Sequence, residues 1–178
     1  TNPPIDSLRE NKVMSLKTRF GNLGNILNFE TLTEKSIYVL ESPILSNSQF
    51  EKFISFFGEN NQTIDCTFSK DENLESAITK IQNESEIAVR KGVTQLVLTD
   101  KKLSEKRCVI PMLLCVGAIN IHLINLSLRG YVSINVQTGE AFDTHSYATL
   151  IGVGATTVNP YLALDSLYQR FKRKLFQN

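Results

Sequence analysis

The segment 131–167 alternates strand-forming and helix-forming stretches, with very few residues left over for connections. A run rich in Val and Ile at 132–136 ends in a Thr-Gly-Glu turn, and a helical segment at 145–152 follows it and stops at glycine. A second strand at 155–158 ends at Asn159-Pro160, where Asn can cap and Pro can open another helix. Strands that are joined by helical crossovers run parallel. The segment therefore predicts an α/β fold with a mainly parallel sheet.

The same strand–helix unit recurs along the chain. We expect earlier strands at 37–40, 63–68 and 95–98, and helices at 49–57, from residue 71 or 73 to 91, and at 112–128. Five such units are too few to close an eight-stranded barrel, so an open doubly wound sheet and a part-barrel both remain possible. Because no linker interrupts the series, one domain over 1–178 is expected.

The two ends of the sequence each predict a helix. A double proline precedes a loose apolar pattern that predicts a helix over 4–20, ending at Gly21. The last residues, 168–178, alternate aromatic or Leu residues with Arg and Lys, which predicts a basic amphipathic helix that can be flexible. The first residue is Thr1, and we expect both ends to be cuts from a longer polypeptide.

The composition is that of a soluble globular protein, with 42% hydrophobic and 21% charged residues. A formal net charge of +1 gives no electrostatic reason to expect nucleic acid or an anionic membrane as a partner. No apolar stretch is long enough for a membrane span. The three cysteines, Cys66, Cys108 and Cys115, are an odd number and form no CxxC motif. They predict reduced thiols and argue against a metal or iron–sulfur site in this segment.

Candidate site residues lie where the expected strands end, because ligands of parallel α/β folds bind at the carboxyl ends of the strands. The polar residues at these positions are Glu41, Ser42, Ser69, Asp71, Thr99, Asp100, Gln137, Thr138, Gly139, Glu140 and Asn159. The alternative is that each serves only a turn or a helix cap.

One enzymatic hypothesis uses Asp100, Glu140 and His145 as an acid/base site of a free-standing βα enzyme, with Asp143 close to His145. A histidine at a helix start is more often structural. The glycine pair at 152–154 lacks the third glycine of a dinucleotide-binding loop and precedes a strand, which favours a simple helix stop. The residues alone thus show a βα scaffold without a complete catalytic set. Such a scaffold fits a segment of something larger, or an enzyme whose site is elsewhere.

Several strings closely resemble the central domain of glutamate synthase. They are TNPPIDSLRE at 1–10, SPIL at 42–45, DCTF at 65–68, IPMLLCVGAINIHLI at 110–124 and TGEAFDTHSYATLIGVGATTVNPYLAL at 138–164. The resemblance runs in order through nearly the whole chain. It implies that residues 1–178 are the later part of that central, connecting domain, whose fold is an incomplete TIM-barrel-like relative of the FMN-binding barrel.

The family makes glutamate from glutamine and 2-oxoglutarate by glutamine hydrolysis, internal ammonia channelling and FMN-dependent reduction. The resemblance implies that FMN and an iron–sulfur cluster are bound by flanking domains. This segment is therefore expected to contain no catalytic, cofactor-binding or metal-binding residue and to be inactive alone. Its implied partners are the amidotransferase and FMN-binding domains of the same polypeptide, with ferredoxin or an NADPH-linked small subunit supplying electrons. The TNPP segment is associated with the ammonia tunnel, so Thr1 and Asn2 are expected to line it.

This chain departs from the family pattern at three positions. It has Ser146 after His145 where the family usually has two histidines, Phe142 where an Arg is usual, and Val153 where an aromatic residue is common. These departures favour a scaffold role for the region. Free use of Asn, Ile and Lys suggests an AT-rich genome, which favours the ferredoxin-dependent type in the plastid stroma, with the bacterial cytoplasm as the alternative.

Overall fold

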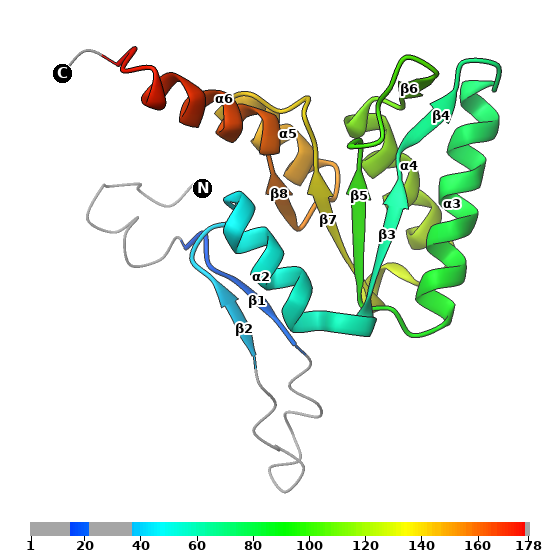
Figure 1. The fold of residues 1–178 in the computed structure, drawn as a ribbon. Helices are drawn as coiled ribbons and strands as arrows, with labels where there is room; N and C mark the ends of the chain where they lie inside the picture. The colour runs from blue at the N-terminus through cyan, green and yellow to red at the C-terminus, as the bar shows by residue number, and fades with distance from the viewer. Residues whose placement is uncertain (1–14, 22–36, 177–178) are drawn as a thin grey trace, which may run out of the picture. The chain divides into compact units, whose positions relative to one another are not determined.

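The computed structural model describes residues 15–21 and 37–176 (Figure 1). The chain divides into two compact units, residues 1–43 and 44–178. In the first unit, β1 (Thr18–Phe20) and β2 (Tyr38–Leu40) pair antiparallel. An ion pair between Lys17 and Glu41, 3.1 Å apart, lies beside them.

Two expectations for this first unit need correction. The helix expected over 4–20 is wrong for residues 15–20, of which 18–20 form β1 and 15–17 have no regular structure. Residues 4–14 lie outside the described residues. The strand expected at 37–40 is present, but it pairs with β1 and does not open the parallel sheet. Pairing with a strand nearby in sequence closes a shorter loop than a crossover does, and it costs less entropy.

The second unit is built on a four-stranded sheet in which neighbouring strands are parallel. Its order is β3 (Asn61–Asp65), β5 (Gln95–Thr99), β7 (Ser133–Gln137) and β8 (Thr157–Asn159). On the far side of β8, Ile44 forms a parallel bridge with Val158, and Leu45 N–H donates to the Val158 carbonyl at 2.9 Å. The segment at Ile44 therefore acts as a fifth, very short strand.

This order makes the sheet an unclosed barrel. Read across the sheet, the strands begin at 61, 95, 133 and 157, and the Ile44 segment then follows, which is the cyclic order of the chain. Among the described residues, Ile44 and β3 do not pair, so the sheet stays open, and α2 (Asn47–Phe57) connects these two positions in the chain. The predicted α/β fold with an incomplete barrel-like sheet is confirmed.

The helices predicted from residue 49 to residue 152 are present with small shifts in their bounds, and local sequence signals start and stop them. The bounds of the helices are α2 (Asn47–Phe57), α3 (Leu74–Arg90), α4 (Met112–Asn125), α5 (Thr144–Gly152) and α6 (Tyr161–Lys172). The helix predicted over 168–178 is present only as far as Lys172, where α6 ends. Ser46 forms a capping box with Gln49, and Gly58, with φ of +48°, ends α2. Asn73 and Asp143 cap α3 and α5 with their side chains. Pro160 is the N-cap of α6, and the proposed cap Asn159 belongs to β8.

The two faces of the sheet differ in polarity. One face contributes Ile64, Leu96, Leu98, Ile134, Val136 and Val158 to a single core with residues of α3, α4 and α5. On the other face, Asn135 Nδ2 donates to Gln95 Oε1 at 3.0 Å, and Thr157 Oγ1 donates to Asn135 Oδ1 at 2.8 Å. Figure 1 shows α2 on this polar side, opposite α3 and α4. Because every such buried polar group needs a partner, these cross-strand bonds fix the register.

The strand expected at 63–68 is two strands. β3 ends at Asp65, and β4 (Thr67–Ser69) turns away to pair antiparallel with β6 (Arg107–Val109), which lies at the end of the expected charged loop. The Asp65 carboxylate accepts hydrogen bonds from the Thr67 backbone N–H at 3.0 Å and its hydroxyl at 2.7 Å. This local bonding turns the chain at Cys66 and ends the parallel strand.

Arg129 stabilises the edge of the sheet where β7 and β8 begin. Its half-buried guanidinium donates to Asn120 Oδ1 at 2.7 Å, to the Gly154 carbonyl at 2.9 Å and to the Val132 carbonyl, and burial lowers its pKa. Gly154 has φ of +127°, and a Cβ there would lie 2.5 Å from Asn120 Cγ. The glycine is therefore required both by its backbone conformation and by the side chain that orients Arg129.

We predict that Gly154→Ala lowers the free energy of unfolding by about 2–3 kcal/mol, because it combines backbone strain with a displaced Asn120. The measurement is urea denaturation of the chain. Gly152→Ala is the matched control: a Cβ at that position would have no atom within 4 Å, and its φ is ordinary. That control is expected to stabilise by about 0.5 kcal/mol. Equal effects of the two substitutions on the free energy of unfolding would contradict the conclusion that Gly154 must be glycine.

Candidate functional site

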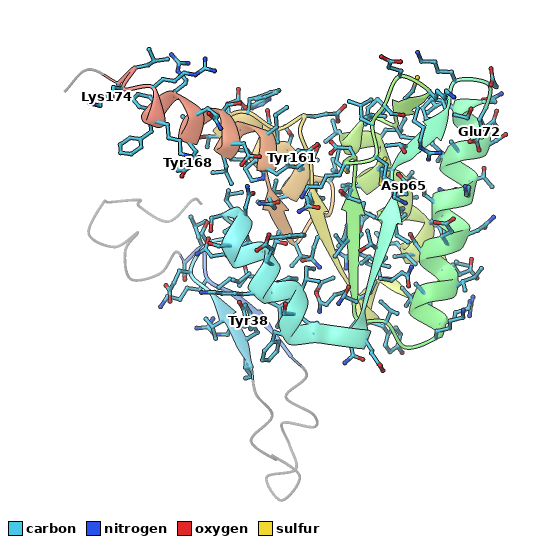
Figure 2. The ribbon with its side chains drawn as sticks, viewed as in Figure 1. Tyr38, Asp65, Glu72, Tyr161, Tyr168 and Lys174 are labelled. Carbon is cyan, nitrogen blue, oxygen red and sulfur yellow. The ribbon has the colours of Figure 1, made fainter. Side chains whose placement is uncertain are left out.

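The carboxyl edge of the sheet is where a site is expected. Figure 2 shows Asp65 and Tyr161 at this edge, which is the upper edge in that view. Asp100 follows β5, and Thr138 and Gly139 follow β7 at the same edge. The structure thus brings some of the predicted residues together and adds two that were not predicted, Asp65 and Tyr161.

Asp100 is almost fully buried, with 3% of its surface exposed. Its Oδ2 accepts hydrogen bonds from Thr138 Oγ1 at 2.6 Å and from the Gly139 backbone N–H at 2.9 Å. Within the part of the chain that the structure describes, its Oδ1 has no hydrogen-bond partner. The carboxylate therefore acts as the acceptor that holds the turn after β7 against the end of β5.

Tyr161, at the first position of α6, covers this turn. Its hydroxyl would lie 3.1 Å from a Cβ at Gly139, so a larger residue there would have to displace the Tyr161 side chain slightly. Burial, followed by the negative charge of Asp100, raises the pKa of Tyr161 to about 12. Lys101 Nζ lies 5.1 Å from the centre of the Tyr161 ring. The sequence signal for Tyr161 was its place directly after the Asn159-Pro160 helix start.

A second charged cluster lies at the end of β3. Arg107 donates to Asp65 Oδ2 at 3.1 Å and to Thr67 Oγ1 at 2.7 Å, and Lys102 Nζ lies 3.5 Å from the same Asp65 oxygen. Both basic side chains are more than one-third exposed, so the pairing is worth little energy by itself. These contacts join β4 to β6. Both oxygens of the Asp65 carboxylate have partners, which argues against Asp65 as a general base.

Glu140 serves the start of α4. Its Oε2 accepts a hydrogen bond from the Met112 backbone N–H at 2.6 Å, where unpaired amides and the helix dipole favour a negative charge. Glu140 and His145 both line a cavity of about 190 Å³ between α4 and α5. Asp143, which was expected near His145, caps α5. The hydrogen bonds from Ser146 lower the Asp143 pKa.

The hypothetical acid/base site is therefore only partly assembled. Glu140 and His145 share a cavity, whereas Asp100 does not line it and is occupied with Thr138 and Gly139. The side chains of Asp100, Glu140 and Asp143 all have structural partners. This arrangement agrees with the alternative that each of these residues serves a turn or a helix start. It gives no support to a three-residue catalytic set.

Several of the remaining candidate residues also have structural hydrogen-bond partners. Thr99 donates to Gln137 Oε1 at 3.3 Å, and Asn159 Nδ2 donates to the Leu45 carbonyl at 3.0 Å and to Asn47 Oδ1 at 2.9 Å. The Ser69 hydroxyl accepts from Asp71 N–H. Glu41 and Ser42 belong to the first unit, and Thr1 and Asn2 lie outside the described residues.

The three cysteines are free thiols, and Cys66 and Cys115 are buried. A hydrogen bond with Cys115, followed by burial, raises the pKa of Cys66. A thiol with a raised pKa is a weak nucleophile. Residues 15–21 and 37–176 bring no three potential metal-ligating side chains together, and within them no helix is long and apolar enough to cross a membrane.

We predict that Asp100→Asn shifts the Tyr161 pKa from about 12 towards its ordinary value, because it removes the negative charge that disfavours tyrosinate. In the unsubstituted chain the unfolded state ionises first, so the free energy of unfolding falls as pH rises from about 10 to about 12. Ultraviolet titration of tyrosinate measures the shift. Tyr161→Phe assigns the signal, and an unchanged titration in Asp100→Asn would contradict the contact.

Comparison with known proteins agrees with the resemblance seen in the sequence. A family model described as the glutamate synthase central domain matches residues 1–178. The chain is 50% identical to the NADPH glutamate synthase large chain of Azospirillum brasilense, over 99% of this chain and 12% of that protein. It is 42% identical to the NADPH glutamate synthase large chain of Bacillus subtilis (strain 168), over 98% of this chain and 11% of that protein.

The chain is also 39% identical to the chloroplastic ferredoxin-dependent glutamate synthase of Spinacia oleracea, over 95% of this chain and 11% of that protein. The chain thus spans only 11–12% of the length of these relatives. Matches of this extent and identity, in both bacterial and chloroplastic proteins, show that the chain belongs to the glutamate synthase central domain family.

Proposed function

We propose that this chain is the non-catalytic connecting domain of a glutamate synthase. The observation that carries the proposal is the use of acidic side chains at the carboxyl edge of the sheet. Asp100 holds a turn, and Glu140 and Asp143 stabilise the starts of α4 and α5. In a catalytic barrel these positions supply the reacting groups, whereas here they complete the scaffold.

The parent enzyme makes glutamate from glutamine and 2-oxoglutarate. In this proposal an amidotransferase domain hydrolyses glutamine, ammonia passes inside the polypeptide, and an FMN-binding domain carries out the reduction. FMN and an iron–sulfur cluster are bound by those flanking domains, and Thr1 and Asn2 line the ammonia tunnel. The central domain keeps its neighbours at a fixed separation, a task that favours a rigid core.

The names of the relatives bear on the electron donor. Identity to the NADPH large chains, at 50% and 42%, exceeds identity to the chloroplastic ferredoxin-dependent protein of spinach, at 39%. These identities favour an NADPH-linked small subunit and the bacterial cytoplasm over the ferredoxin and plastid suggested by composition. We therefore propose the bacterial alternative for this chain.

In the full-length synthase, Glu140→Gln and His145→Ala are expected to leave kcat for glutamate formation and for glutamine hydrolysis within about threefold of the unsubstituted enzyme. The reason is that neither side chain contacts a reacting atom in the proposed scaffold role. Steady-state assays of both activities measure the effect. Glu59→Gln, an exposed carboxylate just after the end of α2, is the matched control.

A fall of about 100-fold in kcat for Glu140→Gln or His145→Ala, with an unchanged melting temperature, would overturn the scaffold role. It would favour the acid/base hypothesis, because loss of a proton-transferring group lowers kcat without lowering stability. A lower melting temperature with preserved kcat agrees with the capping role of Glu140.

The second test concerns flavin. The 178-residue chain, produced alone and passed through gel filtration, is expected to show no flavin absorbance, because the FMN site is assigned to a flanking domain. Far-ultraviolet circular dichroism confirms that the sample is folded. Flavin that co-elutes with the folded chain would contradict the proposal.

A further inference from the structure

Helix α4 has apolar side chains on its exposed face as well as on its buried face. Its sequence, MLLCVGAINIHLIN, contains no Asp, Glu, Lys or Arg. Met112, Cys115, Val116, Ile119 and Leu123 face the core and are buried. The opposite face, where these positions fall within about 100° of one another around the helix, carries exposed residues that are also apolar: Leu113, Leu114, Ile121 and Ile124. Asn125, in the last turn, is the exposed polar residue of the helix. An amphipathic surface helix normally turns charged residues outward, and a helix that is apolar all round is normally covered on both sides.

The neighbouring helix shows that this is a property of α4 and not of the whole layer. α3 packs beside α4 on the same face of the sheet. The exposed positions of α3 include Glu75, Lys80, Glu84 and Arg90, and Ile87 is its one strongly exposed aliphatic residue in the second half. The exposed face of α4 is therefore a local apolar strip beside a charged border, the pattern of an interface core with a polar rim.

A groove extends this strip towards α5, which packs on the other side of α4. The cavity of about 190 Å³ is lined by Met112, Leu113, Ala141, Thr149 and Leu150, with Glu140, His145 and Ser146 supplying its polar atoms. Phe142, 63% exposed, and Ile151 follow the lining residues Ala141 and Leu150 in the chain and are also apolar. The cavity can hold one large aliphatic or aromatic side chain, which is how the anchor residues of protein interfaces are usually accommodated.

We propose that the outer face of α4, together with this groove, is the docking surface for another domain of the same glutamate synthase polypeptide. The occupant is an apolar segment that lies along Leu114, Ile121 and Ile124 and inserts one anchor side chain beside Leu113. This inference rests on the proposed function, because it takes the chain to be one domain of the full-length enzyme.

The length of the relatives supports that occupant. The chain spans 12% and 11% of the two NADPH large chains, so most of such a polypeptide lies outside it. A covalently linked domain is present at high effective concentration and needs no charge attraction to find its site. The absence of charged residues from α4 fits such a partner, since a diffusing partner gains its association rate from electrostatic steering.

The first experiment measures whether α4 is covered in the full-length enzyme. Ile121→Cys and Glu75→Cys are made separately, and maleimide labelling of each new thiol is followed by peptide-level mass spectrometry. Ile121 is 59% exposed in this chain, and Glu75 is exposed on α3. The thiol at position 121 is expected to react about tenfold or more slowly than the thiol at position 75, because the docked domain shields it. Equal rates would overturn the proposal.

The second experiment identifies what covers the helix. A photo-crosslinking amino acid replaces Ile121 in the full-length enzyme, and the cross-linked peptides are sequenced. Cross-links to the same polypeptide outside residues 1–178 are the expected result. Cross-links to residues 1–43 of this chain, to a second copy of the polypeptide or to a separate subunit would overturn the proposal.

Assays of glutamine hydrolysis and glutamate formation on the same preparations separate the two hypotheses. An active enzyme with an accessible or differently covered α4 overturns the docking surface and leaves the proposed function intact. A folded full-length protein without either activity overturns the proposed function itself.

Discussion

The side chain of Asn159, on β8, links the Ile44 segment to the parallel sheet. It donates to the Leu45 carbonyl and to Asn47, and it accepts from Gln137 on the neighbouring strand. A buried amide without partners would cost several kcal/mol, so the loss of any one of these partners is expected to destabilise the native state. They hold the Ile44 segment beside β8 and thereby place α2 over the polar face. The backbone bond from Leu45 N–H to the Val158 carbonyl acts at the same place.

The polar groups at the sheet edge follow the same logic. Asp100 binds the turn after β7, Asp65 turns the chain out of β3, and Glu140 stabilises the start of α4. Each is placed where an enzyme of this architecture would hold a reacting group, and each is instead engaged by a neighbouring turn or helix start. The chemistry of this edge supports the scaffold role that we propose for the chain.

Local signals account for what could be predicted from the sequence. Ser46, Asn73, Asp143 and the glycine at 58 start or end helices through bonds to residues within a few positions. The antiparallel pair of β4 and β6 was missed because it depends on Arg107 reaching Asp65 across 42 residues. Likewise, Asp100 was identified as a strand-end residue, but its burial against Tyr161 depends on where α6 begins. Such long-range contacts leave no periodic pattern in the sequence.

The unclosed barrel leaves β3 at the edge of the sheet, without a second strand partner among the described residues. An open edge is a template on which a foreign strand can pair, and it invites aggregation. The sequence of β3, NQTID, is short and polar, and only Ile64 within it is fully buried. Asp65 ends it with a charge, and the chain then bends away. An open sheet of this kind can thus avoid edge-to-edge association, because a strand pairing with β3 would bury little apolar surface.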